Sequence, residues 1–128
     1  MIYLDSSVVL AHVLAENRRP DEALWREPLT SSLLLSYEVW NRLNAKKLAA
    51  VHGEDADAIF AATVLIDLTP TILRRALSPF PAPVRTLDGL HLATMVFLQR
   101  ENVYVELATY DVRMATAAAA LGIGIAAI

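Results

Sequence analysis

The chain has 128 residues and a formal net charge of -3 at pH 7, so it is long enough for one domain with a core and is not a polycationic nucleic-acid coat. It contains no cysteine, which excludes disulfide bonds and zinc–thiolate sites. Hydrophobic residues make up 55% of the chain, slightly more than usual, and this excess predicts an apolar surface that is buried by self-association or by a partner.

Short apolar runs alternate with helical patterns along the whole chain. The apolar runs predict strands at residues 2–4, 30–35, 65–68, 104–108 and 123–128. Helical spacing predicts helices from Ser6 or Ser7 to about Glu16, after Pro20, and over residues 37–51, 56–64, 72–77, 87–100 and 112–121. Such alternation is typical of an α/β fold, and we expect a single domain, residues 1–128, with a central parallel sheet covered by helices on both faces.

Local signals set the expected boundaries of these elements. Ser6 or Ser7 can cap the first helix. The pair His52-Gly53 is expected to end the long helix over residues 37–51, because glycine suits the position after a helix. The proline-rich segment 78–83 is expected to be a rigid loop.

The two ends of the chain carry no signal for export or membrane insertion. The first five residues lack the basic and apolar regions of a signal peptide. The most apolar stretch, residues 114–128, is shorter than the roughly 20 residues needed to cross a bilayer and is interrupted by glycine. We therefore expect a cytoplasmic protein with no membrane contact.

Four acidic residues lie where a strand gives way to a helix, or just inside the helix: Asp5, Glu38, Asp88 and Asp111. The carboxyl ends of parallel strands gather at one edge of a sheet, where such folds bind ligands. Four carboxylates gathered there would repel one another unless a cation lay between them. The pattern therefore predicts a site for a hard divalent metal ion, Mg²⁺ or Mn²⁺, and with it phosphate chemistry.

Each of these acids, taken singly, also has an ordinary structural explanation. Asp5 and Asp111 suit helix caps, while Glu38 and Asp88 suit the positive end of a helix dipole. The metal site is favoured by the set of four and not by any one member. His91 lies one helical turn after Asp88 and is expected to be a packed core histidine, although it is also placed to orient Asp88.

Motifs for other chemistries are missing from the sequence. No GxGxxG follows the first strand, and there is no Walker-type lysine loop. The three histidines are not at a metal-ligand spacing. Ser6 and Ser7 have no neighbouring acid–base partner for a hydrolase triad, and the second aspartate of a haloacid-dehalogenase phosphatase is also missing.

Four segments, in order, resemble the PIN-domain nucleases, and more narrowly the VapC-type toxins of toxin–antitoxin pairs. They are residues 3–7 (YLDSS), 36–39 (SYEV), 86–93 (TLDGLHLA) and 109–111 (TYD). Any one of these segments is a weak signal, but together they span nearly the whole chain. One departure is Gly89, where the family often has alanine.

The resemblance implies a sandwich of helices around a parallel sheet and an endoribonuclease that depends on Mg²⁺ or Mn²⁺ and hydrolyses RNA with a metal-activated water. It implies that the catalytic and metal-binding acids are Asp5, Glu38, Asp88 and Asp111. It implies that Ser6 and Thr109 place hydroxyl groups behind the metal ligands. It also implies a small antitoxin partner, and the apolar composition favours a homodimer.

Two other functions remain open from the sequence. One is a catalytically inactive PIN-like domain that binds RNA or protein, and the other is a DNA nuclease of the same fold. The intact set of four acids favours catalysis. Basic residues stand near the predicted site, but the sequence assigns no RNA contact to any of them: Arg42, Lys46, Lys47, Arg74, Arg75 and Arg85.

Overall fold

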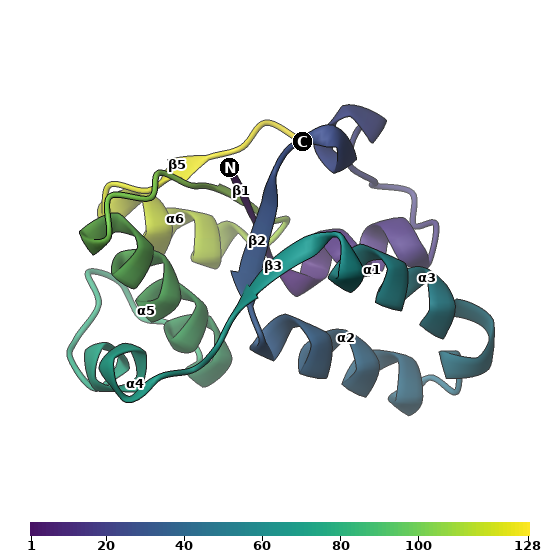
Figure 1. The fold of residues 1–128 in the computed structure, drawn as a ribbon, viewed down its shortest axis with the longest axis horizontal. Helices are drawn as coiled ribbons and strands as arrows, with labels where there is room; N and C mark the ends of the chain where they lie inside the picture. The colour runs from purple at the N-terminus through teal and green to yellow at the C-terminus, as the bar shows by residue number, and fades with distance from the viewer.

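A computed structural model describes residues 1–128, and its centre is a five-stranded parallel sheet (Figure 1). The strands are β1 (Ile2–Leu4), β2 (Leu29–Ser32), β3 (Thr63–Ile66), β4 (Glu106–Ala108) and β5 (Gly124–Ile125). The helices are α1 (Ser6–Val13), α2 (Leu34–Ala45), α3 (Ala49–Ala61), α4 (Pro70–Ala76), α5 (Thr86–Arg100) and α6 (Val112–Ala120), with a short 3₁₀ helix at Glu22–Arg26. The predicted α/β fold class is confirmed.

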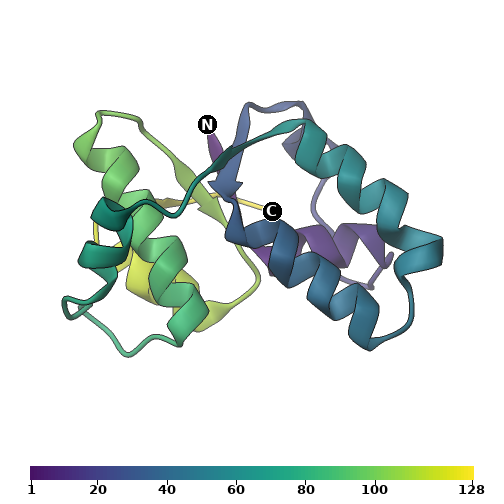
Figure 2. The ribbon, with the colours of Figure 1, turned by 60° about the horizontal axis from the view of Figure 1, so that its bottom comes forward.

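The helices form two groups, one on each side of the strands, as Figure 1 and Figure 2 both show. Helices α1, α2 and α3 pack on one core, which includes Leu4, and helices α5 and α6 pack on another, which includes Tyr3. Neighbouring residues of a strand point to opposite faces, so β1 contributes to both cores. None of the helices combines the length and apolar composition that spanning a bilayer requires.

The order of the strands is β3-β2-β1-β4-β5. Strands β2 and β3 are therefore added on one side of β1. The chain then crosses back, and β4 and β5 are added on the other side of β1. In parallel sheets of this kind, the strand order reverses at a point where the loops separate and leave a crevice. That point lies between the carboxyl ends of β1 and β4, immediately before Asp5 and Thr109.

The start of α1 differs from the expectation that Ser6 or Ser7 caps it. The helix begins at Ser6, and the residue at the cap position is Asp5, whose side chain makes no capping hydrogen bond. Helix α1 also ends earlier than expected, because Ala15 adopts a left-handed conformation with a φ of 50°.

The strand expected at residues 30–35 ends at Ser32, and α2 begins at Leu34. An apolar run alone does not separate a buried strand from the start of a buried helix. As a result Glu38 lies in the second turn of α2, and the first turn of that helix contains no acid. The expectation that Glu38 sits in the first turn is wrong.

The single long helix expected over residues 37–51 is also wrong, because α2 ends at Ala45 and α3 begins at Ala49. Lys47 breaks the helix with a φ of 57°. The expected stop at Gly53 lies inside α3. A Cβ atom at Gly53 would lie 2.6 Å from Cη2 of Trp40, so this glycine lets the indole ring pack against the helix.

The helix predicted over residues 56–64 is displaced, because α3 ends at Ala61 and residues 63 and 64 belong to β3. The other elements lie within a few residues of their predicted positions. Pro70 occupies the first turn of α4, where its missing N–H costs nothing. The segment 78–83 contains neither helix nor strand, so the predicted proline loop is confirmed. Strands β4 and β5 are shorter than the predicted runs at residues 104–108 and 123–128.

Candidate functional site

Asp5 follows the central strand β1 and is only 5% exposed. Its Oδ2 atom accepts a hydrogen bond from the Ser7 hydroxyl at 2.6 Å and another from the Thr109 hydroxyl at 2.7 Å. Its Oδ1 atom receives no hydrogen bond from the protein. The carboxylate is thus fixed through one oxygen while the other is free to bind a ligand.

The hydroxyls of Ser7 and Thr109 also hydrogen-bond to backbone amides of the loop after β4. The Ser7 oxygen accepts a hydrogen bond from the Tyr110 amide at 3.1 Å, and the Thr109 oxygen accepts one from the Asp111 amide at 3.0 Å. Because each hydroxyl has a single proton, accepting from an amide leaves that proton for Asp5. This loop and Asp5 therefore hold each other in place.

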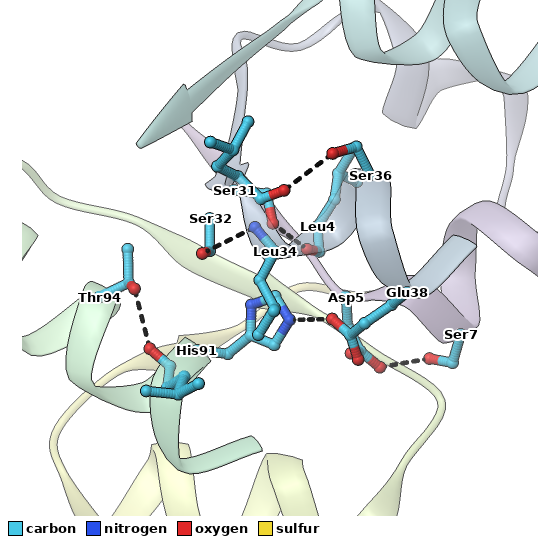
Figure 3. Close-up of polar contacts among 12 residues, drawn as sticks. Leu4, Asp5, Ser7, Ser31, Ser32, Leu34, Ser36, Glu38, His91 and Thr94 are labelled. Atoms are coloured by element: carbon cyan, nitrogen blue, oxygen red, sulfur yellow. Dashed lines mark hydrogen bonds and ion pairs between the residues drawn. The ribbon is translucent and has the colours of Figure 1, made fainter. Parts of the chain in front are cut away.

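Ser6, which the sequence suggested for this role, makes no side-chain hydrogen bond in the structure. The neighbouring Ser7 makes the contact with Asp5 instead, as Figure 3 shows. Ser6 and Ser7 are adjacent residues of one helix and so point in different directions. The sequence pattern alone does not decide which of the two faces the acid.

Glu38 is held by His91, a residue of α5 that is fully buried (Figure 3). The Nε2 atom of His91 hydrogen-bonds to Oε1 of Glu38, and its Nδ1 atom lies 2.7 Å from the Tyr3 hydroxyl. The Tyr3 oxygen in turn accepts the amide of Ser32 at 3.1 Å. In the tautomer with its proton on Nε2, the imidazole donates to Glu38 and accepts the hydroxyl proton of Tyr3 at Nδ1.

The Tyr3 hydroxyl stays protonated in this chain of hydrogen bonds, because burial raises the pKa of Tyr3. It therefore keeps a proton that it can donate to Nδ1 of His91. The expectation that His91 is a packed core residue is confirmed by its burial, but the carboxylate that it orients is Glu38 and not Asp88.

Asp88 lies in the first turn of α5 and forms no hydrogen bond through its side chain. Burial, the charge of Asp5 and the charge of Asp111 raise the pKa of Asp88, and the nearby Arg85 opposes the shift. Asp88 thus lies close enough to Asp5 and to Asp111 for the charge of each to act on it. Repulsion of this kind favours binding of a cation.

Asp111 caps α6, as its sequence position suggested. Its Oδ1 atom accepts the amides of Arg113 and Met114 at 2.9 and 3.3 Å. Its Oδ2 atom lies 3.6 Å from the guanidinium of the exposed Arg85. Asp111 therefore has a structural role of its own, and only one of its oxygens is left for a ligand.

The donors at this edge of the sheet are all carboxylate oxygens, which suit Mg²⁺ or Mn²⁺. No group of three acidic or histidine side chains converges closely enough to form a ready-made metal cage. A complete cage is not needed for Mg²⁺, which commonly binds one or two carboxylates and keeps several waters. The chemistry of the donors and the repulsion at Asp88 fit such an ion.

Comparison with known proteins places this arrangement in a family. The family model of the PIN domain matches residues 2–120. Ribonuclease VapC46 of Mycobacterium tuberculosis is 37% identical over 133 residues, which cover 98% of this chain and 96% of that protein. Ribonuclease VapC35 of the same organism is 26% identical over 130 residues, which cover 99% of this chain and 96% of that protein. The chain therefore belongs to the PIN-domain family, among proteins of the VapC type.

Proposed function

We propose that this protein is a divalent-metal-dependent endoribonuclease and the toxin of a toxin–antitoxin pair. One observation carries the proposal: Asp88 is acted on by the charges of Asp5 and Asp111 at the crevice between β1 and β4. The similarity over nearly the whole chain to two proteins named ribonucleases supports RNA as the substrate.

In this proposal the catalytic and metal-binding residues are Asp5, Glu38, Asp88 and Asp111. A bound Mg²⁺ or Mn²⁺ ion would supply a lowered pKa for a water molecule and positive charge for the phosphodiester. Ser7 and Thr109 fix Asp5, and His91 fixes Glu38, so that these carboxylates are already oriented when the ion binds. We retain Thr109 in the supporting role and assign the other hydroxyl to Ser7 in place of Ser6.

A PIN-like domain that only binds RNA or protein is the alternative. The environment of Asp5 disfavours a binding-only domain. Burying a carboxylate with one unpaired oxygen costs folding free energy, and without a bound cation nothing offsets that cost. A domain without catalysis has no need of this charge. The cap of α6 alone explains Asp111, so Asp5, Glu38 and Asp88 are the acids that favour catalysis.

The substitution Asp5→Asn tests the proposal. Asparagine keeps the shape of the side chain and removes the charge that binds the ion, so we expect metal-dependent cleavage of RNA to fall at least a hundredfold. The folded protein should be as stable as the wild type in EDTA, or more so, because one repulsive charge is gone. Thermal unfolding and cleavage of total RNA measure the two effects. A folded Asp5→Asn protein that cleaves RNA at the wild-type rate would refute the mechanism.

The proposal extends to partners and location. We propose a cytoplasmic homodimer held inactive by a small antitoxin, which places an arginine or lysine at the acids in place of the metal. Large hydrophobic residues remain on the surface of the single chain, among them Tyr37, Leu77 and Val112, which is consistent with burial in an assembly. A purified protein that stays monomeric, and whose expression leaves growth unchanged, would contradict this part.

A further inference from the structure

A basic hollow of about 210 Å³ lies beside the candidate site. Its walls come from α1, α2 and the loops after α1, α2 and β4. Its polar lining consists of Ser7, Glu16, Arg18, Arg42, Lys46 and Tyr110. Three cations therefore face one carboxylate in this hollow, whereas the whole chain carries a formal charge of -3. The hollow is therefore positively charged, although the chain as a whole is negatively charged.

The cations of the hollow have no acidic partners in the structure. The two pairs at ion-pair distance in the molecule are Arg85 with Asp111 and His91 with Glu38. The guanidinium of Arg18 lies 4.3 Å above the ring of Tyr110, and neither Arg42 nor Lys46 forms a side-chain hydrogen bond. Their charges are free to bind an anion.

The hollow is continuous with the acids through Ser7. This serine lines the hollow and donates its hydroxyl proton to Asp5 at 2.6 Å. A polyanion bound at the acids would thus extend toward these cations. A second hollow, of about 180 Å³, contains Arg85 and Arg113, but Arg85 already faces Asp111.

We propose that the hollow formed by Arg18, Arg42 and Lys46 binds a backbone phosphate of single-stranded RNA, next to the phosphate that is cleaved. The inference rests on the proposed function and assigns it a substrate-binding subsite. The guanidinium of arginine can donate two parallel hydrogen bonds to the oxygens of one phosphate. A guanidinium that lies over an aromatic ring also presents a flat surface on which an unpaired base can stack. The Arg18 and Tyr110 pair has this form.

The test is the double substitution Arg42→Gln and Lys46→Gln. The matched control is Arg26→Gln with Arg100→Gln, which removes the same charge from two exposed residues. Arg26 precedes β2 and Arg100 precedes β4, so both control residues lie toward the opposite edge of the sheet. Thermal unfolding should show that both double variants are folded.

Binding is measured first by fluorescence anisotropy, with a labelled single-stranded RNA and the Asp5→Asn background so that the RNA is not consumed. We expect the Kd of the hollow variant to rise roughly tenfold. The slope of log affinity against log salt should fall by about 0.7 for each phosphate that the variant no longer neutralises. In the active protein, KM should rise while kcat stays close to the wild-type value, and the control variant should match the wild type throughout.

Equal affinity and equal salt slope in the hollow and control variants would overturn the inference. Normal RNA binding combined with weaker binding of an acidic protein partner would also overturn it, because the hollow would then be a protein-binding surface. A wild-type protein that cleaves no RNA would refute the proposed function instead, and the anisotropy measurement would still decide whether the hollow binds RNA.

Discussion

The imidazole of His91 links two helices on opposite sides of the sheet, since it lies on α5 and holds an acid of α2. Both of its nitrogen atoms have partners, and both of these partners are buried or half-buried. A side chain in this position fixes the direction of the Glu38 carboxylate. In our proposal His91 is a positioning residue and touches neither the ion nor the RNA.

We expect His91→Gln to retain this function better than His91→Leu. Glutamine carries an N–H that can replace the Nε2 donor. Leucine leaves the Glu38 carboxylate without this donor and the Tyr3 hydroxyl proton without its acceptor. The leucine variant should be less stable by roughly 2–3 kcal/mol, the cost of buried polar groups left unpaired. It should also bind Mn²⁺ more weakly, as measured by calorimetry. Equal Mn²⁺ affinities in the two variants would show that the hydrogen bond to Glu38 does not position the ligand.

Asp88 gives a prediction about pH. Burial and the charges of Asp5 and Asp111 raise the pKa of Asp88 above its ordinary value of 3.8. A raised pKa in the folded state means that stability from this group is present below pH 3.8 and is lost as the pH rises through the raised value. In EDTA, Asp88→Asn should therefore be more stable than the wild type at neutral pH.

The stabilisation by Asp88→Asn should shrink as the pH falls, because the wild-type carboxyl is then neutral as well. Thermal unfolding of both proteins in EDTA, from about pH 8 down to about pH 4, would measure it. A difference in melting temperature that does not change with pH would show that repulsion between the acids is not its cause.

Single residues also show what the sequence could reveal about the site. The helix cap formed by Asp111 could be predicted from the sequence, because its hydrogen bonds involve only the next few residues of the chain. The bond between His91 and Glu38 joins residues 53 positions apart, so no local spacing could predict it. The choice between Ser6 and Ser7 depended on where α1 begins, and one residue there decides which hydroxyl reaches Asp5.

At the scale of elements, the break between α2 and α3 was hidden because its left-handed residue is Lys47 and not glycine. Helix C-termini are usually recognised from glycine at this position. The only nearby glycine, Gly53, serves a different purpose, which is the close approach of Trp40. The indole N–H of Trp40 donates a hydrogen bond to the Asp57 carboxylate at 3.0 Å, which links α2 to α3.

This packing predicts that Gly53→Ala destabilises the protein, although alanine is the better helix former. A new Cβ atom 2.6 Å from the indole must displace it. Overpacking of this kind costs about 1–3 kcal/mol, which exceeds the gain of about 1 kcal/mol in helix propensity. Urea unfolding measures the difference. In a Trp40→Leu background the same substitution should become neutral or stabilising, and destabilisation of equal size there would show that the indole is not the cause.

At the scale of the whole molecule, the fold was predictable because strands and helices alternate throughout. Parallel strands all end at one edge, so locating the acids relative to the strands was enough to predict that Asp88 lies within reach of the charges of Asp5 and Asp111. The order of the strands was not evident from the sequence. It depends on how the two helical groups share the faces of the sheet.

Metal binding should stabilise the whole domain in our proposal. The ion binds only the folded state, in which the acids are gathered, so the melting temperature should rise with metal concentration. At about one hundred times Kd the gain is roughly 2.7 kcal/mol, or several degrees for a domain of this size. Differential scanning fluorimetry with Mg²⁺, Mn²⁺ and Ca²⁺ measures it, with Asp5→Asn as the control. Equal shifts in both proteins would place the ion elsewhere.

The parallel pairing of β1 with β4 also bears on how the protein is made. Asp5 is synthesised before Thr109, whose hydroxyl holds it and which follows 104 positions later in the chain. Strand β4 is the direct neighbour of β1, so the centre of the sheet stays open on one side until that segment arrives. A nascent chain that already carries Asp5, Glu38 and Asp88 thus still lacks the loop that fixes the first of them. The carboxylate of Asp5 is therefore fixed only after β4 and the loop behind it have joined the sheet.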